Sequence, residues 1–252
     1  MKEFDPNRLA RLATRAGIIL MRSGAETYRV EETMNYILKS YGASVCDSYA
    51  TPTLLITSFS LDGELYHNIK RVKMGDIDLD KIIKINDLSR LAYKHDLSLE
   101  EFEKRLSDIE NEASFSLPFK IFGAFICAFG FAFFFKGDLK DALCAALIGS
   151  FIEFLLLKIS HLSFPNFFKY VFLSMILTLL SIIMALIFKC DRDIVTISSL
   201  MLLVPGLAIT NAIRDSVSLD LVSGLVRASE AIINAAAIAL GSLLVMFMMR
   251  GL

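Results

Sequence analysis

The pattern of apolar and polar positions changes near residue 117, where scattered charges give way to long apolar runs. Residues 1–116 hold 16 of the 26 Lys and Arg and 19 of the 27 Asp and Glu. A bilayer core of roughly 30 Å needs about 20 apolar helical residues to cross it. Five segments reach or approach that length: 118–135, 142–158, 168–188, 194–213 and 228–249. The pattern therefore predicts an α-helical integral membrane domain of about five transmembrane helices (117–252), preceded by a small α/β cytoplasmic domain (1–116).

The α/β content of residues 1–116 follows from local signals. Asp5-Pro6 predicts a helix start, since proline is favoured in the first helical turn, and Gly24 separates this helix from a second one. Asp62-Gly63 predicts a tight hairpin between two strand-like runs. Ser98 and Glu101 form a capping-box pattern. The first predicted helix begins at Pro6, has helical spacing through Leu20 and is interrupted at Gly24. The other predicted helices are 25–41, 79–94 and 99–112, and the predicted strands are 43–49, 53–61 and 64–72.

The stretch SGAETYRVEETM, residues 23–34, concentrates three glutamates and an arginine on one short helix. Ser23 and Glu26 have capping-box spacing, which predicts that Glu26 reaches back to the amide of the N-cap residue. Arg29 lies within one turn of Glu26, so an ion pair on the helix surface is expected. A capped helix with solvated ion pairs explains Glu26 and Arg29, but it leaves Thr27 and Glu31 without a role.

Residues 1–116 carry no set of side chains typical of an active site. Pro52 and Thr53 indicate an ordinary strand entry, because proline cannot donate to a central strand ladder; a ligand site is the alternative. The cysteines and the histidines, His67, His95 and His161, show no metal-ligand spacing, so neither a metal nor a cofactor is predicted. The net charge of −1 and the lack of a basic patch argue against nucleic acid. We therefore expect no enzyme activity.

The fourth apolar segment contains Pro205-Gly206 near its middle, with Thr210 and Asn211 one turn later. Proline removes a backbone donor and glycine adds backbone freedom. Inside a bilayer, the freed backbone groups must be satisfied by protein or by a water-filled cavity. A simple kink is one interpretation, and a broken helix at a substrate site is the other.

The fifth segment places Arg227, Glu230 and Asn234 on one helix face. An arginine there can hold a carboxylate substrate, because its planar fork matches carboxylate geometry. An Arg227–Glu230 pair at the membrane surface is the alternative. Arg214 and Asp215 are expected at the same interface, as pathway residues or as loop charges. Glu153 lies in the second apolar segment, where ionisable residues are costly and often functional; a place near the headgroups explains it equally well.

Three motifs in this order resemble the threonine/serine exporter family: AGIILMRSGAETYRVEETM, then TPT at 51–53, then VPGLAITNAIRD and SGLVRASEA. The resemblance covers nearly the whole chain and is closest to the larger subunit of the split, two-component type implicated in succinate export. The motif positions in the N-terminal domain are Glu26, Thr27, Arg29, Glu31, Pro52 and Thr53. Relatives often carry glycine where this chain has Leu54, which argues against a tight turn there.

The resemblance implies a multi-pass exporter of small carboxylates, either hydroxy amino acids or dicarboxylates such as succinate. Fused members have about ten helices, so a separate membrane partner of about four helices is implied. Homo-oligomerisation stays open. The residue patterns described above predict the substrate-binding or pathway residues, which are Pro205, Gly206, Thr210, Asn211, Arg214, Asp215, Arg227, Glu230, Asn234 and Glu153.

The N-terminus is charged and lacks an apolar signal core, which favours a cytoplasmic N-terminal domain and insertion in the inner membrane. Loop charges lean the same way, since seven Lys and Arg are expected inside and five outside. The competing hypothesis is a membrane-tethered enzyme or sensor that acts through residues 1–116. That hypothesis predicts activity from residues 1–116 expressed alone.

Overall fold

The computed structural model describes residues 4–73, 75, 77–94, 97–113, 115–160 and 164–249. His95 and His161 lie outside these ranges. The chain divides into two compact units. Unit 1 comprises Met1–Ser114 together with Leu207–Ser229, and unit 2 comprises Phe115–Gly206 together with Glu230–Leu252. The N-terminal part of the chain thus forms one unit with a helical segment that follows it by almost a hundred residues.

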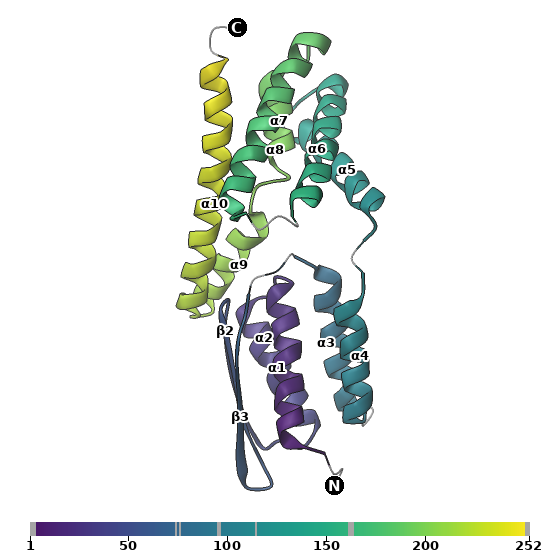
Figure 1. Ribbon diagram of the computed structural model, residues 1–252, viewed down its shortest axis with the longest axis vertical. Coiled ribbons are helices and arrows are strands. Elements are labelled where there is room, and N and C mark those ends of the chain that lie inside the picture. The colour runs from purple at the N-terminus through teal and green to yellow at the C-terminus, as the bar shows by residue number, and fades with distance from the viewer. Residues whose placement is uncertain are drawn as a thin grey trace. The chain divides into compact units, whose positions relative to one another are not determined.

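Unit 1 contains a three-stranded antiparallel sheet with helices on one of its faces (Figure 1). The strand order is β1-β2-β3, and the elements follow the order predicted from the sequence. They are α1 (Pro6–Arg22), α2 (Thr27–Ser40), β1 (Val45–Thr51), β2 (Leu54–Leu61), β3 (Glu64–Arg71), α3 (Leu79–Lys94) and α4 (Leu99–Asn111).

The core of unit 1 lies between the sheet and α1 and α2. Leu55 and Phe59 alternate inward along β2 and are completely buried, as are Leu9 of α1 and Met34 of α2. Each of these side chains contributes roughly 1.5–3 kcal/mol by leaving water. The other face of the sheet carries exposed side chains.

Two hairpins connect the strands. Asp62 and Gly63 both have positive φ, 53° and 85°, as the predicted two-residue turn requires. Pro52 and Thr53 form an equally short connection between β1 and β2. The expectation that Leu54, in place of glycine, prevents a tight turn is therefore wrong. The Thr51 hydroxyl accepts from the Leu54 N–H at 3.0 Å, which closes this turn without glycine.

Unit 2 consists of apolar helices. They are α5 (Leu117–Phe134), α6 (Leu139–Ile159), α7 (Asn166–Phe188), α8 (Arg192–Leu200) and the later part of α10 (Leu221–Met248), whose first turns belong to unit 1. Small residues allow close packing: a Cβ on Gly149 of α6 would lie 2.8 Å from the Ala128 Cβ of α5. Such contacts are typical of helices that associate within lipid.

Within the described ranges, four helices are long and apolar enough to span a membrane: α5, α6, α7 and α10. The predicted segment 194–213 is not a continuous helix. It divides into α8, which ends at Leu200, and α9 (Gly206–Val217), with residues 201–205 outside any helix. Pro205 explains this break, because it lacks an N–H and clashes with the preceding turn.

Candidate functional site

The connection between α1 and α2 contains the Gly-Ala-Glu-Thr part of the family-like motif. Gly24 has φ 91° and follows the Ser23 C-cap of α1. The Gly24 N–H donates to the Met21 carbonyl and the Ala25 N–H donates to the Leu20 carbonyl, at 3.2 and 3.0 Å. This is the Schellman arrangement that ends a helix. The predicted Ser23–Glu26 capping box is therefore wrong, since Ser23 ends α1 instead of beginning α2.

Asp215 of α9 caps the start of α2 instead. Its Oδ1 accepts from the Thr27 backbone N–H at 3.1 Å, and its Oδ2 accepts from the Thr27 hydroxyl at 3.0 Å. Glu26, the N-cap residue of α2, makes no capping hydrogen bond with its side chain. The first N–H groups of a helix have no partner within that helix. Asp215 supplies the missing acceptor for α2, although it lies 188 positions later in the sequence.

Arg227 of α10 pairs with the same carboxylate and is almost completely buried. Its Nε lies 3.0 Å from the Asp215 Oδ2, and the exposed fractions of the two residues are 2% and 0%. The Arg227 Nη2 donates to the Ala25 carbonyl at 2.6 Å and to the Met21 sulfur at 3.3 Å. We refer to Thr27, Asp215 and Arg227 as the buried network.

The charges of the buried network match the ends of the helices that they contact. A helix carries partial positive charge at its N-terminus and partial negative charge at its C-terminus. Asp215 lies at the N-terminus of α2, and Arg227 binds a carbonyl just beyond the C-terminus of α1. The two buried charges therefore neutralise each other and stabilise the same helix–helix connection.

Further polar contacts surround the buried network. Glu26 is buried and forms ion pairs with Arg29 of α2 and Arg214 of α9. The pairing with Arg29 was predicted from the sequence, and the pairing with Arg214 was not. The Asn211 amide of α9 donates to the Gly24 carbonyl at 2.8 Å. The motif is thus held by three residues of α9 and one of α10.

Glu31 occupies a half-buried position near this site. Its Oε1 accepts from the Ala50 N–H of the edge strand β1 at 2.8 Å. Burial raises the pKa of the Glu31 carboxyl; the Ala50 N–H lowers it in part, and the carboxylates of Asp220, Asp47 and Asp215 raise it further. Burial, followed by the nearby Asp215, also raises the pKa of Asp220. Both residues without a sequence-based role, Thr27 and Glu31, are therefore hydrogen-bonded in the structure.

The other predicted site residues lie elsewhere. Thr210 is exposed on α9, and Pro52 and Thr53 form the β1–β2 turn. Pro205, Gly206, Glu230, Asn234 and Glu153 belong to unit 2, with Asn234 buried on α10 and Glu153 half-buried within reach of the Lys120 charge. Of the predicted set, the structure brings together Glu26, Thr27, Arg29, Asn211, Arg214, Asp215 and Arg227.

One contributor was missed from the sequence. Gly224, one turn before Arg227, lies so close to α9 that an added Cβ would overlap the Ser216 Oγ and lie 3.0 Å from the Ala212 carbonyl. This close approach brings Arg227 to Asp215. No local pattern in the sequence identifies the helix that Gly224 contacts.

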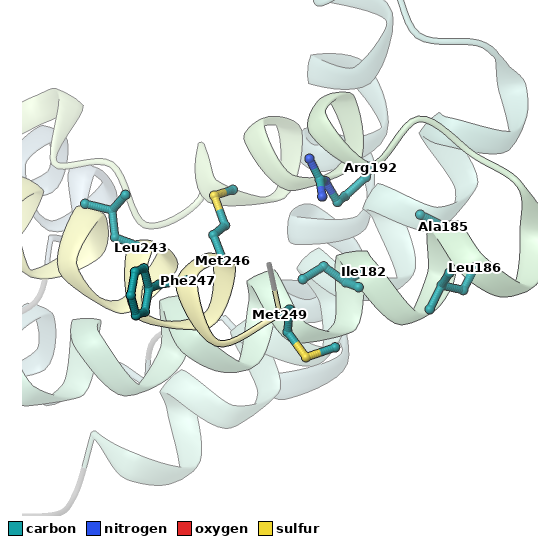
Figure 2. Close-up of a pocket in the computed structure, with 8 residues that line it drawn as sticks. All are labelled: Ile182, Ala185, Leu186, Arg192, Leu243, Met246, Phe247 and Met249. Atoms are coloured by element: carbon teal, nitrogen blue, oxygen red, sulfur yellow. The ribbon is translucent and has the colours of Figure 1, made fainter. Parts of the chain in front are cut away.

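A cavity of about 620 Å³ in unit 2 contains none of the predicted site residues. Figure 2 shows that its lining is apolar apart from Arg192, with Leu243, Met246 and Phe247 of α10 and Ile182, Ala185 and Leu186 of α7. Such a lining suits hydrocarbon better than a polar metabolite. A second hollow, of about 350 Å³, lies between α2 and α3 in unit 1 and is polar. We therefore take the buried network and its surroundings as the candidate site.

Comparison with known proteins supplies the family. The profile of the ThrE family, described as "Putative threonine/serine exporter", matches residues 11–249. No curated protein and no solved structure matches the chain. The match includes most of α1, the buried network and all four long apolar helices. The chain therefore belongs to the threonine/serine exporter family of membrane transport proteins.

Proposed function

We propose that the chain is the larger subunit of a two-component exporter that moves a small carboxylate out of the cell. The substrate is a hydroxy amino acid, such as threonine or serine, or a dicarboxylate, such as succinate. The second component is a membrane protein of about four helices, and the N-terminal domain lies in the cytoplasm. The family match and the four apolar helices support export; the substrate and the partner are part of the proposal.

The buried network is the observation that carries a specific mechanism. Arg227 is the only buried arginine among the described residues, and a guanidinium out of water needs a carboxylate to compensate its charge. In this structure the carboxylate belongs to Asp215. A substrate carboxylate offers the same two oxygens and the same charge, so it can replace Asp215 as the partner of Arg227.

This exchange couples substrate binding to a structural change. When Asp215 leaves Arg227, it also leaves the N-terminus of α2, because one carboxylate holds Thr27 and Arg227 together. In the proposed mechanism, the helix that moves is α9, which carries Asp215 and begins directly after the break at Pro205. Without substrate, the movement would take the Asp215 carboxylate away from the buried Arg227 at a cost of about 3–5 kcal/mol. The conformational change is thereby suppressed when no substrate is bound.

The sequence contains no glycine-rich loop that would cradle the phosphates of ATP. We therefore propose that an ion gradient or the substrate gradient supplies the energy. A membrane-tethered enzyme or sensor remains the competing function, and the extensive contacts of α9 and α10 with the N-terminal motif make it less attractive. A helix that serves only as an anchor needs no buried charged side chains hydrogen-bonded to the tethered domain.

Efflux of labelled succinate and labelled threonine tests the proposal. Cells that lack their own exporters would express the chain alone, the four-helix partner alone, or both. We expect efflux of one substrate only when both proteins are present. Absence of efflux of both substrates, with both proteins verified in the membrane, would contradict the proposed substrate class. Activity of residues 1–116 alone would favour the tethered enzyme.

A further inference from the structure

The outer face of the sheet in unit 1 has a regular arrangement of side chains that the exporter mechanism does not use. Side chains of a strand alternate between faces, and the strand registers place the outward ones in four rows across the sheet. The first row is Val45–Ser60–Leu65, the second is Asp47–Ser58–His67, and the third is Tyr49–Ile56–Ile69. The fourth row, Thr51–Leu54–Arg71, borders the β1–β2 turn. We call the surface formed by the first three rows the outer sheet face.

The outer sheet face is apolar at both ends and polar in the middle. Val45 and Leu65 are 64% and 69% exposed, and Tyr49 and Ile69 are 46% and 57% exposed. Large apolar side chains grouped in this way are typical of interaction surfaces. Among the described residues, neither Asp47 nor His67 has an ion-pair partner. The face thus presents two mainly apolar rows and one polar row in which Asp47 and His67 are exposed.

We propose that this surface binds the same surface of a second copy of the chain, related by a twofold axis that runs parallel to β2. Sheets that pack face to face keep their strands within about 30° of each other and lie about 10 Å apart. A rotation about an axis along β2 places β1 of one copy over β3 of the other. Tyr49 then faces Ile69 of the second copy, Val45 faces Leu65, and Asp47 faces His67.

The polar row decides between the two symmetric arrangements. A twofold axis perpendicular to the strands would place Asp47 over Asp47 and His67 over His67. It would thus oppose two carboxylates that have no donor between them. The axis along β2 instead gives each carboxylate an imidazole, which has an N–H to donate whether it is charged or neutral. The face is therefore complementary to itself in one arrangement only, as an isologous interface requires.

Other occupants fit this surface less well. A membrane surface is recognised by clusters of Lys and Arg, whereas the middle row carries one acid and one histidine. The footprint of the sheet is small, roughly 23 Å by 14 Å from the strand length and spacing. We therefore expect a weak dimer that forms where membrane insertion concentrates the two copies.

A charge-reversal cycle in the full-length protein tests the arrangement. Association would be measured in liposomes by energy transfer between labelled copies, over a range of protein-to-lipid ratios. We expect Asp47→Lys or His67→Glu to weaken association by about tenfold or more, because the first removes the carboxylate that accepts from the imidazole and the second opposes two carboxylates. The double variant should associate within about threefold of the wild type. Asp87→Lys, an exposed position on α3, is the control for the charge change and should have no effect.

A cross-linking experiment tests the axis independently. Ser58 lies in the middle row of the central strand, so the axis passes beside it and brings the two copies of Ser58 together. In a chain whose four native cysteines are replaced by alanine, Ser58→Cys should be cross-linked between copies by a bis-maleimide of about 10 Å, a length that matches the sheet separation. Asp87→Cys should not be cross-linked.

Two results would overturn the inference: wild-type copies that do not associate in liposomes, or association that neither single reversal weakens. If the proposed export activity were not found, the association measurement would still be interpretable, because association in liposomes is measured without substrate. Conversely, loss of the dimer would not by itself contradict the exporter mechanism, which depends on the buried network.

Discussion

Asp215 and Arg227 illustrate how one residue pair links three helices. Removing one partner of a buried ion pair leaves the other charge uncompensated, which costs about 3–5 kcal/mol. We therefore expect Asp215→Asn and Arg227→Gln each to lower the free energy of unfolding strongly, and the double variant to lose less than the sum of the two. Thermal unfolding of the purified protein in lipid nanodiscs measures this coupling.

The Arg192–Asp193 pair is the matched control for this cycle. Its two side chains are 52% and 76% exposed, at a distance of 3.1 Å. Exposed pairs contribute about 0–1 kcal/mol, so Arg192→Gln and Asp193→Asn should change the unfolding midpoint little and additively. Additive effects at Asp215 and Arg227 would show that the two residues do not depend on each other.

Glu31 gives a pH-dependent prediction. Because burial raises its pKa in the folded protein, the folded state retains the proton at pH values where the unfolded chain has lost it. Glu31 therefore destabilises the fold progressively as pH rises from about 4.5, the ordinary value, through the raised pKa. We expect the unfolding midpoint of Glu31→Gln to rise relative to that of the wild type as pH increases across this window. Above the raised pKa, the difference between the two midpoints should stay constant. Glu32→Gln, on the same helix, controls for the loss of a charge.

For single residues, the sequence predicted a contact only where the partner lies within a few positions along the chain. The Glu26–Arg29 pair follows from helical spacing and is present. The roles of Thr27 and Glu31 could not be predicted, because their partners lie in α9 and β1. The capping box failed for a related reason: Ser23 and Gly24 fit both a helix start and a helix end, and the positive φ of Gly24 decided in favour of the end.

Among the elements, the close approach of α9 and α10 is sensitive to substitution at Gly224. Gly224→Val would introduce atoms where the Ser216 side chain and the Ala212 carbonyl already lie. Overpacking of this kind costs about 1–3 kcal/mol, and it would move Arg227 away from Asp215. We expect a lower unfolding midpoint and a loss of efflux.

Gly123→Val is the matched control, since an added Cβ on Gly123 has no atom within 4 Å among the described residues. It should leave both the unfolding midpoint and efflux near wild-type values. Equal effects of the two substitutions would show that the α9–α10 contact has no special importance.

Most elements were predictable because their signals are local. Asp62-Gly63 has the backbone freedom that the β2–β3 turn needs, and the long apolar runs of α5, α6, α7 and α10 follow from composition. The segment 194–213 was predicted as one helix because hydropathy averages over its break. Pro205 predicted a kink or a break in this segment. Whether proline bends or ends a helix depends on the neighbours that satisfy the freed backbone groups.

On the scale of the whole molecule, unit 1 includes α9 and the first turns of α10 together with the N-terminal part of the chain. Hydropathy cannot predict this grouping, since it describes each segment alone. The family match supports an exporter, and the buried network suggests how such an exporter senses a carboxylate. In the proposed mechanism, the Asp215 carboxylate on Arg227 keeps the transporter closed until a substrate carboxylate replaces it.

The most direct test is efflux of the labelled substrate from cells that express the four-helix partner with the wild type, Arg227→Ala or Arg192→Ala. We expect Arg227→Ala to abolish efflux while its membrane insertion equals that of the wild type, because no other buried arginine among the described residues can accept the substrate carboxylate. Arg192→Ala should retain efflux. Wild-type efflux by Arg227→Ala would contradict the central claim and remove the buried network from the transport mechanism.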